Sequence, residues 1–268
     1  NFFNFQIYEF ISKQNHYLKN NFSNEDKVAK PTYDFLDLNS ERLSGIASFI
    51  GLNILLLFFL LTFNYEQFVE LPKATANQLA EETHERVGAV IGSIVMAIVV
   101  IMFYFKGSFN FDKKAKFLKI LAQIWVFLNG VLVLSAFAKN TEYVVNLGLT
   151  YKRLGVYAFL LLSIIGLVFT FIKIQKKKTN AFLFNQMFWY VYGTILVCSF
   201  INWGGIITSH NLERKDFAAN YHLNSVDFND KQLLEYYQKT NNKEMYKILK
   251  DKIIARQNKS FLSKVLYD

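Results

Sequence analysis

The chain has 268 residues, of which 52% are hydrophobic, 17% aromatic and 19% charged. Soluble domains average about 25% charged residues, and here the charges are also excluded from five blocks of about 20 residues. This pattern excludes an ordinary soluble globule and a disordered chain. Cys198 is the only cysteine, which excludes a disulfide framework and a cysteine zinc site within the chain. The composition indicates a polytopic membrane protein.

The first 42 residues precede the first apolar block, and we expect them to form a cytoplasmic or interfacial segment. The sequence begins with Asn1 rather than methionine, so we expect further residues upstream. The apolar stretch 1–11 then forms the end of another hydrophobic or interfacial segment. A basic region followed by a small-residue cleavage site is not visible, so we predict no signal peptide.

Five windows without Asp, Glu, Lys or Arg follow in chain order, and each is long enough to cross a bilayer. A helix rises about 1.5 Å per residue, so about 20 apolar residues span a hydrocarbon core about 30 Å thick. Membrane β-strands would instead alternate in polarity over about 10 residues. We therefore predict an all-α polytopic membrane protein, with transmembrane helices at 43–63, 87–105, 120–138, 154–172 and 182–203.

Small and polar residues inside these spans indicate helix contacts. Gly88 and Gly92 have the spacing at which helix backbones approach closely, which predicts a packing face within the chain or with a partner. We expect the polar side chains at bilayer depth to form interhelical hydrogen bonds. A narrow polar path for a solute is the alternative. The polar residues concerned are Asn53, Gln123, Asn129 and Asn185.

Lysine and arginine in the loops predict the orientation. Nine lie in the loop 106–119 and in the loop after the fourth span, against five in the loops 64–86 and 139–153. Cytoplasmic loops carry the excess of positive charge, so we place the N-terminal segment in the cytoplasm and the C-terminal end in the periplasm. The tail 204–268 begins with a predicted glycine hinge. Its two short helical patterns, at 230–238 and 242–258, are too short to bury a core, so we expect them to lie on the membrane or to dock on a partner.

The sequence carries no motif for a nucleophile elbow, a zinc protease, a phosphate-binding loop or a dinucleotide site. We therefore expect no catalytic residue, no metal and no cofactor. The predicted spans hold no ionisable residue in their interiors, which argues against a self-contained proton-driven pump. The basic residues flank spans and have a topogenic explanation, so we predict no nucleic-acid binding.

Arginine is rare here, with 5 arginines against 25 lysines. Its planar guanidinium forms paired hydrogen bonds that lysine cannot reproduce, so a retained arginine suggests a specific partner such as Glu142, Glu213 or Asp216. Two arginines lie at the predicted outer mouths of the fourth and fifth spans, which a short loop makes neighbours. We predict one hydrogen-bonded cluster there, either structural or gripping a partner or lipid headgroup. Its members are Thr150, Arg153, Asn211 and Arg214.

Two patterns around these arginines resemble a known family. The pattern GLTxxR (Gly148, Leu149, Thr150, Arg153) and the pattern NLxR (Asn211, Leu212, Arg214) are similar to bacterial membrane proteins catalogued as a domain of unknown function of the 4153/4173 type. The resemblance implies a multi-span inner-membrane protein and supplies no reaction. The family's members typically have more than five spans, and the lysine- and asparagine-rich composition would suit the Bacteroidota.

From the sequence we expect a non-catalytic integral inner-membrane subunit or scaffold of a bacterial envelope complex. Its expected partners are membrane lipids and other membrane or periplasmic proteins. A small-solute transporter or channel, and a membrane sensor coupled to a cytoplasmic partner, are the alternatives. Purification in mild detergent separates the first two, because a scaffold brings stoichiometric proteins and a transporter brings a solute.

Overall fold

The structure is a computed structural model that describes residues 19–24, 27, 31, 37–68 and 76–257. The regular secondary structure of this part of the chain is helical, apart from one isolated bridge between Asn21 and Lys178. Of the N-terminal segment expected over 1–42, residues 1–18 lie outside the described part. The chain divides into two compact units, which we call unit 1 (residues 1–141 and 156–196) and unit 2 (residues 142–155 and 197–268).

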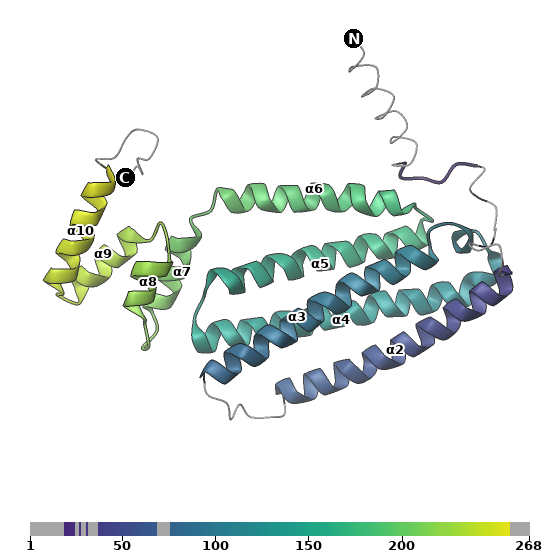
Figure 1. Cartoon of the computed structure of the whole chain (residues 1–268), viewed down its shortest axis with the longest axis horizontal. Helices are drawn as coiled ribbons and strands as arrows, with labels where there is room; N and C mark the ends of the chain where they lie inside the picture. Colours follow the sequence, from purple (N-terminus) through teal and green to yellow (C-terminus); the bar gives the residue numbers. More distant parts are fainter. Residues whose placement is uncertain (1–18, 25–26, 28–30, 32–36, 69–75, 258–268) are drawn as a thin grey trace, which may run out of the picture. The chain divides into compact units, whose positions relative to one another are not determined.

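Five long helices contain stretches that are long and apolar enough to cross a membrane. The prediction of an all-α polytopic membrane protein is therefore confirmed. Most of these helices extend beyond the predicted windows, because the windows exclude charged residues whereas the helices continue through them. The five helices are α2 (Leu38–Phe68), α3 (Ala76–Tyr104), α4 (Lys116–Leu147), α5 (Tyr151–Gln175) and α6 (Asn180–Ser199) (Figure 1).

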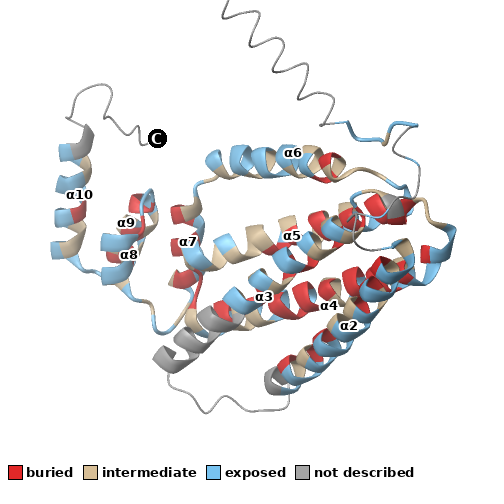
Figure 2. Cartoon of the chain, turned by 45° about the vertical axis from the view of Figure 1, so that its right-hand side comes forward, coloured by how far each residue is buried: buried red, intermediate tan, exposed pale blue. Residues whose placement is uncertain are grey.

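Helix α4 is the most enclosed of the five. In its most apolar window 44% of the residues are buried, against 17% in α6. Figure 2 shows the same difference, with many buried positions along α4 and mostly exposed ones along α6. Aromatic contacts join the outer helices to their neighbours. Phe49 of α2 packs on Tyr104 of α3 with ring centroids 5.4 Å apart, and Phe169 of α5 packs on Tyr190 of α6 at 5.3 Å.

A buried lysine holds the C-terminal end of α3. The last carbonyls of a helix lack partners within it, and cations near them are favourable. Lys173, which is fully buried in α5, donates from Nζ to the carbonyl oxygen of Phe105 at 2.7 Å. The Nδ2 of Asn110 donates to the same oxygen at 2.8 Å. The sequence predicted that Lys173 lies in a loop and helps to orient the chain in the membrane. In the structure α5 continues past Lys173, whose hydrogen bond to Phe105 links α5 to the end of α3.

The C-terminal tail folds into four short helices within unit 2, namely α7 (Trp203–Leu212), α8 (Ala219–Ser225), α9 (Asp230–Lys239) and α10 (Lys243–Gln257). The last two agree with the predicted helical patterns. Contrary to the expectation of a tail without a core, α9 and α10 bury a small one made of Leu233, Tyr237 and Leu249.

The predicted hinge at Gly204 and Gly205 is not where the chain bends. Helix α6 ends at Ser199 rather than at Trp203, and both glycines lie in the first turn of α7. The Oδ1 of Asn202 caps this turn by accepting from the N–H of Gly205 at 2.9 Å. A Cβ atom on Gly204 would lie 1.6 Å from the carbonyl oxygen of Asp227. This glycine therefore serves close packing of α7 against the segment before α9.

Candidate functional site

The connection between α4 and α5 ends α4 with a glycine cap. Gly148 has a φ of 83°, the left-handed conformation common just after a helix, and its N–H donates to the carbonyl of Val144 at 2.8 Å. A Cβ atom there would lie 2.7 Å from Oδ1 of Asn211. Both the backbone conformation and this close approach require glycine.

Asn211 of α7 binds the connection from the other side. Its Oδ1 accepts from the N–H of Leu149 at 2.7 Å, and its Nδ2 donates to the carbonyl of Leu149 at 2.8 Å. One side-chain amide thus satisfies both backbone groups of a buried residue, which would otherwise be costly to bury. This pair of bonds joins α7 to the α4–α5 connection.

His222 continues this polar network inside unit 2. Its Nε2 lies 3.2 Å from Nδ2 of Asn211, and its Nδ1 lies 3.0 Å from Oγ1 of Thr208. The Nδ2 of Asn229 donates to Oγ1 of Thr208 and to the carbonyl of His222, both at 2.9 Å. All four side chains are buried. The ring of Phe217 stacks on the imidazole with centroids 4.7 Å apart.

The hydrogen-bond partners determine the tautomer of His222. The Oδ1 of Asn211 accepts from Leu149, so its Nδ2 is the amide nitrogen and can only donate. Nε2 of the imidazole must then accept, and Nδ1 carries the proton and donates to Thr208. Burial lowers the pKa of His222 from its ordinary value, which favours this neutral form.

Both arginines of the predicted cluster bind the C-terminal carbonyls of α4. Arg214 donates to the carbonyls of Val145 and Asn146, the latter at 2.6 Å, and to Oδ2 of Asp216 at 3.0 Å. Arg153 donates to the carbonyl of Leu147 at 3.0 Å and to that of Gly148. These carbonyls are the groups that a helix leaves without partners, and the positive charges also favour the negative end of its dipole.

One pocket of about 250 Å³ brings the four predicted residues together. Thr150, Arg153, Asn211 and Arg214 all line it. They are linked mainly through the backbone of residues 145–149, and Asp216, one of the expected carboxylates, binds Arg214. The remaining lining residues are Leu147, Leu149, Asp216, Phe217, Ala218, Tyr221 and His222.

A known protein family matches most of the chain. The family described as a domain of unknown function, DUF4153, matches residues 11–235. The chain belongs to the DUF4153 family. No curated protein and no solved structure matches it. The matched range includes both patterns that carried the resemblance and every residue that lines the pocket of this DUF4153 protein.

The glycines of the second span lie away from neighbouring helices of the DUF4153 protein. A Cβ atom on Gly88 or Gly92 would meet nothing within 4 Å. Other glycines of the membrane helices are packed, among them Gly166 of α5, where a Cβ atom would lie 3.5 Å from Sδ of Met187 and 3.6 Å from Cδ1 of Ile98. A packing role for Gly88 and Gly92 is therefore not seen inside the described chain, and contact with a partner stays a prediction.

The polar residues at bilayer depth bind different elements. Asn53 of α2 donates to the carbonyl of Leu121 on α4 at 3.1 Å, which is an interhelical bond of the expected kind. Asn129 donates to the carbonyl of Trp125 in its own helix at 2.8 Å, and Asn185 donates to Oδ1 of Asn20 at 2.8 Å. Gln123 is half-buried on α4. Within the described residues no three His, Cys, Asp or Glu side chains group as metal ligands.

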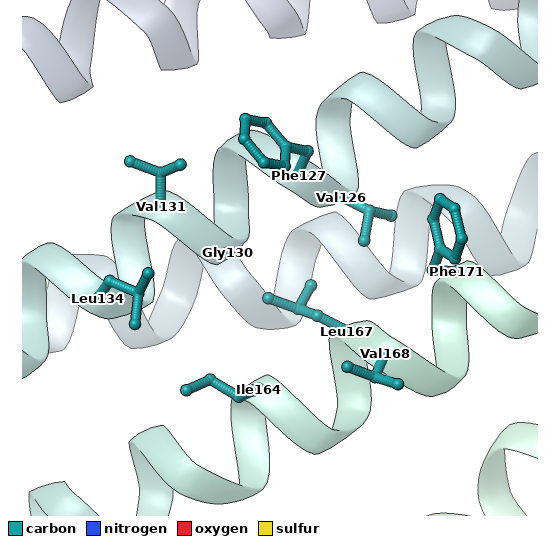
Figure 3. A pocket seen from close by; sticks show the side chains of 9 residues that line it. All are labelled: Val126, Phe127, Gly130, Val131, Leu134, Ile164, Leu167, Val168 and Phe171. Carbon is teal, nitrogen blue, oxygen red and sulfur yellow. The ribbon is translucent and has the colours of Figure 1, made fainter.

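An apolar groove of about 360 Å³ lies between α4 and α5. Figure 3 shows apolar side chains from both helices around it, with Gly130 leaving space on α4. Both helices are candidate spans, so an apolar chain at membrane depth suits this groove better than a polar ligand. Its lining residues are Val126, Phe127, Gly130, Val131, Leu134, Ile164, Leu167, Val168 and Phe171.

Apart from Asn211, the residues of the buried polar network were not predicted from the sequence. Thr208 and Asn211 lie one turn apart on α7, which places them on one face of that helix. The histidine and Asn229 come from later elements, and no sequence spacing connects them to α7. The spacing of three residues between Thr208 and Asn211 was the available signal.

Proposed function

We propose that this DUF4153 protein is a non-catalytic integral subunit or scaffold of the bacterial inner membrane. Its five spans anchor it, and unit 2 binds partner proteins of an envelope complex on the periplasmic side. The observation that carries this proposal is how unit 2 uses its polar side chains. They hold α7 and α8 to the α4–α5 connection.

A fixed surface suits partner recognition. Asn211, His222 and Thr208 are buried and bonded to backbone groups or to one another, so unit 2 is held in one arrangement. Preorganisation of this kind lowers the entropic cost of binding. The outer side chains include large apolar groups that no membrane span requires. Outside the candidate spans, those exposed in unit 2 are Phe200, Ile206, Tyr221, Phe228, Ile248 and Ile254.

Phe228 is the strongest anchor candidate among them. It is 62% exposed, and its φ of 57° is unusual for a bulky residue. The turn that holds it is pinned, because Nδ2 of Asn202 donates to the carbonyl of Phe228 at 2.9 Å and the N–H of Asp227 donates to the hydroxyl of Tyr151 at 3.3 Å. Strained residues that a structure holds in place are often functional, and exposed aromatics often dominate interfaces.

The test compares Phe228→Gly with Asn241→Gly. Asn241 is also exposed and has a φ of 55°, so glycine relieves the same backbone strain at both positions. We expect the wild type and Asn241→Gly to bring a stoichiometric partner protein through mild-detergent purification. Phe228→Gly should keep its melting temperature and lose the partner. A wild type that purifies without any protein partner would contradict the proposal.

A small-solute transporter or channel is the second candidate. The Oδ1 atoms of Asn53 and Asn129 are buried and accept no hydrogen bond in the described part of the chain. A solute that donates hydrogen bonds would satisfy such oxygens. A chain that purifies alone with a stoichiometric small molecule, and loses it in Asn53→Leu or Asn129→Leu, would favour this candidate.

A further inference from the structure

The pocket in unit 2 gathers two cations at one place. Arg153 and Arg214 both line it. Both guanidiniums are partly shielded from water, since the side chain of Arg214 is 19% exposed and Arg153 is half-buried. Like charges in such a place repel each other, and an anion between them removes that repulsion.

The pocket is also lined by side chains that carry hydrogen-bond donors. A guanidinium carries five N–H groups in a rigid fork, which matches the oxygens of phosphate or carboxylate. The carbonyls at the end of α4 hold both forks in position. Thr150 and Tyr221 line the same pocket, and each carries a hydroxyl group that can donate.

The other charged or titratable groups of the pocket define the net charge. Asp216 is ionised at neutral pH, because its hydrogen bond with Arg214 lowers the pKa of its carboxyl group. Its side chain is 68% exposed, so solvent screens its charge. His222 is neutral, with its nitrogens engaged by Thr208 and Asn211. The pocket therefore keeps a net positive charge even with Asp216 in place.

We propose that this pocket binds a phosphate group, held between Arg153 and Arg214 with Thr150. The ligand is either the headgroup of a phospholipid or a free phosphate anion. The α4–α5 connection joins two candidate spans, so it lies at a membrane surface, where phosphate is the abundant anion. A volume of about 250 Å³ suits a headgroup and is smaller than most drug-sized sites. This inference does not depend on the scaffold proposal.

The experiment titrates the full chain in an uncharged maltoside detergent with two probes at constant ionic strength. The probes are inorganic phosphate and dihexanoyl phosphatidylglycerol, and calorimetry measures both affinities. Tighter binding of the lipid by about tenfold or more assigns the site to a headgroup. Equal or tighter binding of inorganic phosphate assigns it to the free anion. Absence of saturable binding of either probe would overturn the proposal.

Asp216→Asn is the decisive variant. It removes the carboxylate that competes with phosphate for Arg214, and it leaves both arginines in place. We expect it to tighten binding about two- to fivefold, the range of an exposed ion pair. Arg214→Lys keeps the charge, loses the fork and should weaken binding about tenfold. Lys152→Gln and Lys215→Gln are matched controls, since each removes an exposed charge beside an arginine. Unchanged affinity in Asp216→Asn, or equal losses in the two lysine controls and in Arg214→Lys, would refute a specific site.

Discussion

At the scale of single residues, the α4–α5 connection shows what sequence patterns can and cannot predict. The positions of Arg153 and Arg214 near the ends of neighbouring spans were enough to predict that they lie in one cluster, and both line the same pocket. Their partners were not predictable, because backbone carbonyls leave no trace in a sequence. Charge alone suggested carboxylates, whereas the structure uses the arginines chiefly to satisfy the last carbonyls of α4.

Asn211→Ala should destabilise unit 2 strongly. The change removes both bonds to Leu149 and leaves a buried N–H and a buried carbonyl without partners, which costs about 2–3 kcal/mol. Asn224→Ala in α8 is the control, because Asn224 is exposed. Limited proteolysis and thermal melting in detergent measure the effect. Similar resistance of the two variants to protease would show that the Asn211 bonds are dispensable.

His222 should make unit 2 sensitive to mild acid. Because burial lowers its pKa, the folded state holds the neutral form, and the unfolded chain binds a proton first as the pH falls. The stabilisation is therefore complete above about pH 6.5 and is lost as the pH falls toward the folded-state pKa. A proton on Nε2 would also face the amide of Asn211, which can only donate.

Melting temperatures between pH 7.5 and pH 5 measure this dependence. His222→Gln should flatten the profile, whereas His210→Gln should leave it unchanged, because His210 is exposed. A profile that persists in His222→Gln would assign the acid sensitivity to another group. The carboxyl of Asp216 titrates in a separate window at lower pH, since its pKa is lowered by Arg214.

At the scale of elements, apolar windows predicted the existence of five membrane helices but not their ends. Helix α4 has 32 residues, and its predicted window covered only 120–138. Lysines at a membrane surface extend their side chains to water without ending the helix, so charge marks the bilayer boundary rather than the helix boundary. Buried Lys173 and the packed glycines of α7 escaped prediction for a related reason, since their roles depend on distant elements.

Gly166→Leu should destabilise unit 1, and Gly92→Leu should not. A leucine at position 166 must displace Met187 of α6 and Ile98 of α3, and such overpacking costs about 1–3 kcal/mol. A leucine at position 92 enters open space. The order is the reverse of what the GxxxG spacing alone suggests. Thermal melting of the purified chain measures both effects, and a larger loss in Gly92→Leu would show that this face is covered in the assembled protein.

At the scale of the whole molecule, the family and the all-α polytopic fold followed from short motifs and from hydropathy. The division into two units did not, because unit 2 combines residues 142–155 with a tail more than 40 residues further along the chain. Orientation rests on the lysine-rich loops, and two of those lysines, Lys119 and Lys173, have structural partners. The side of the membrane on which unit 2 lies therefore requires a direct measurement.

Cysteine labelling tests the periplasmic placement of unit 2, on which the proposed role depends. Cys198 is the only cysteine, so Cys198→Ser provides a clean background. Lys250→Cys in α10 and Lys176→Cys after α5 each place one thiol at an exposed position. In intact spheroplasts a membrane-impermeant maleimide should label Lys250→Cys at once and Lys176→Cys only after permeabilisation. The opposite pattern would place unit 2 in the cytoplasm and contradict the proposed role.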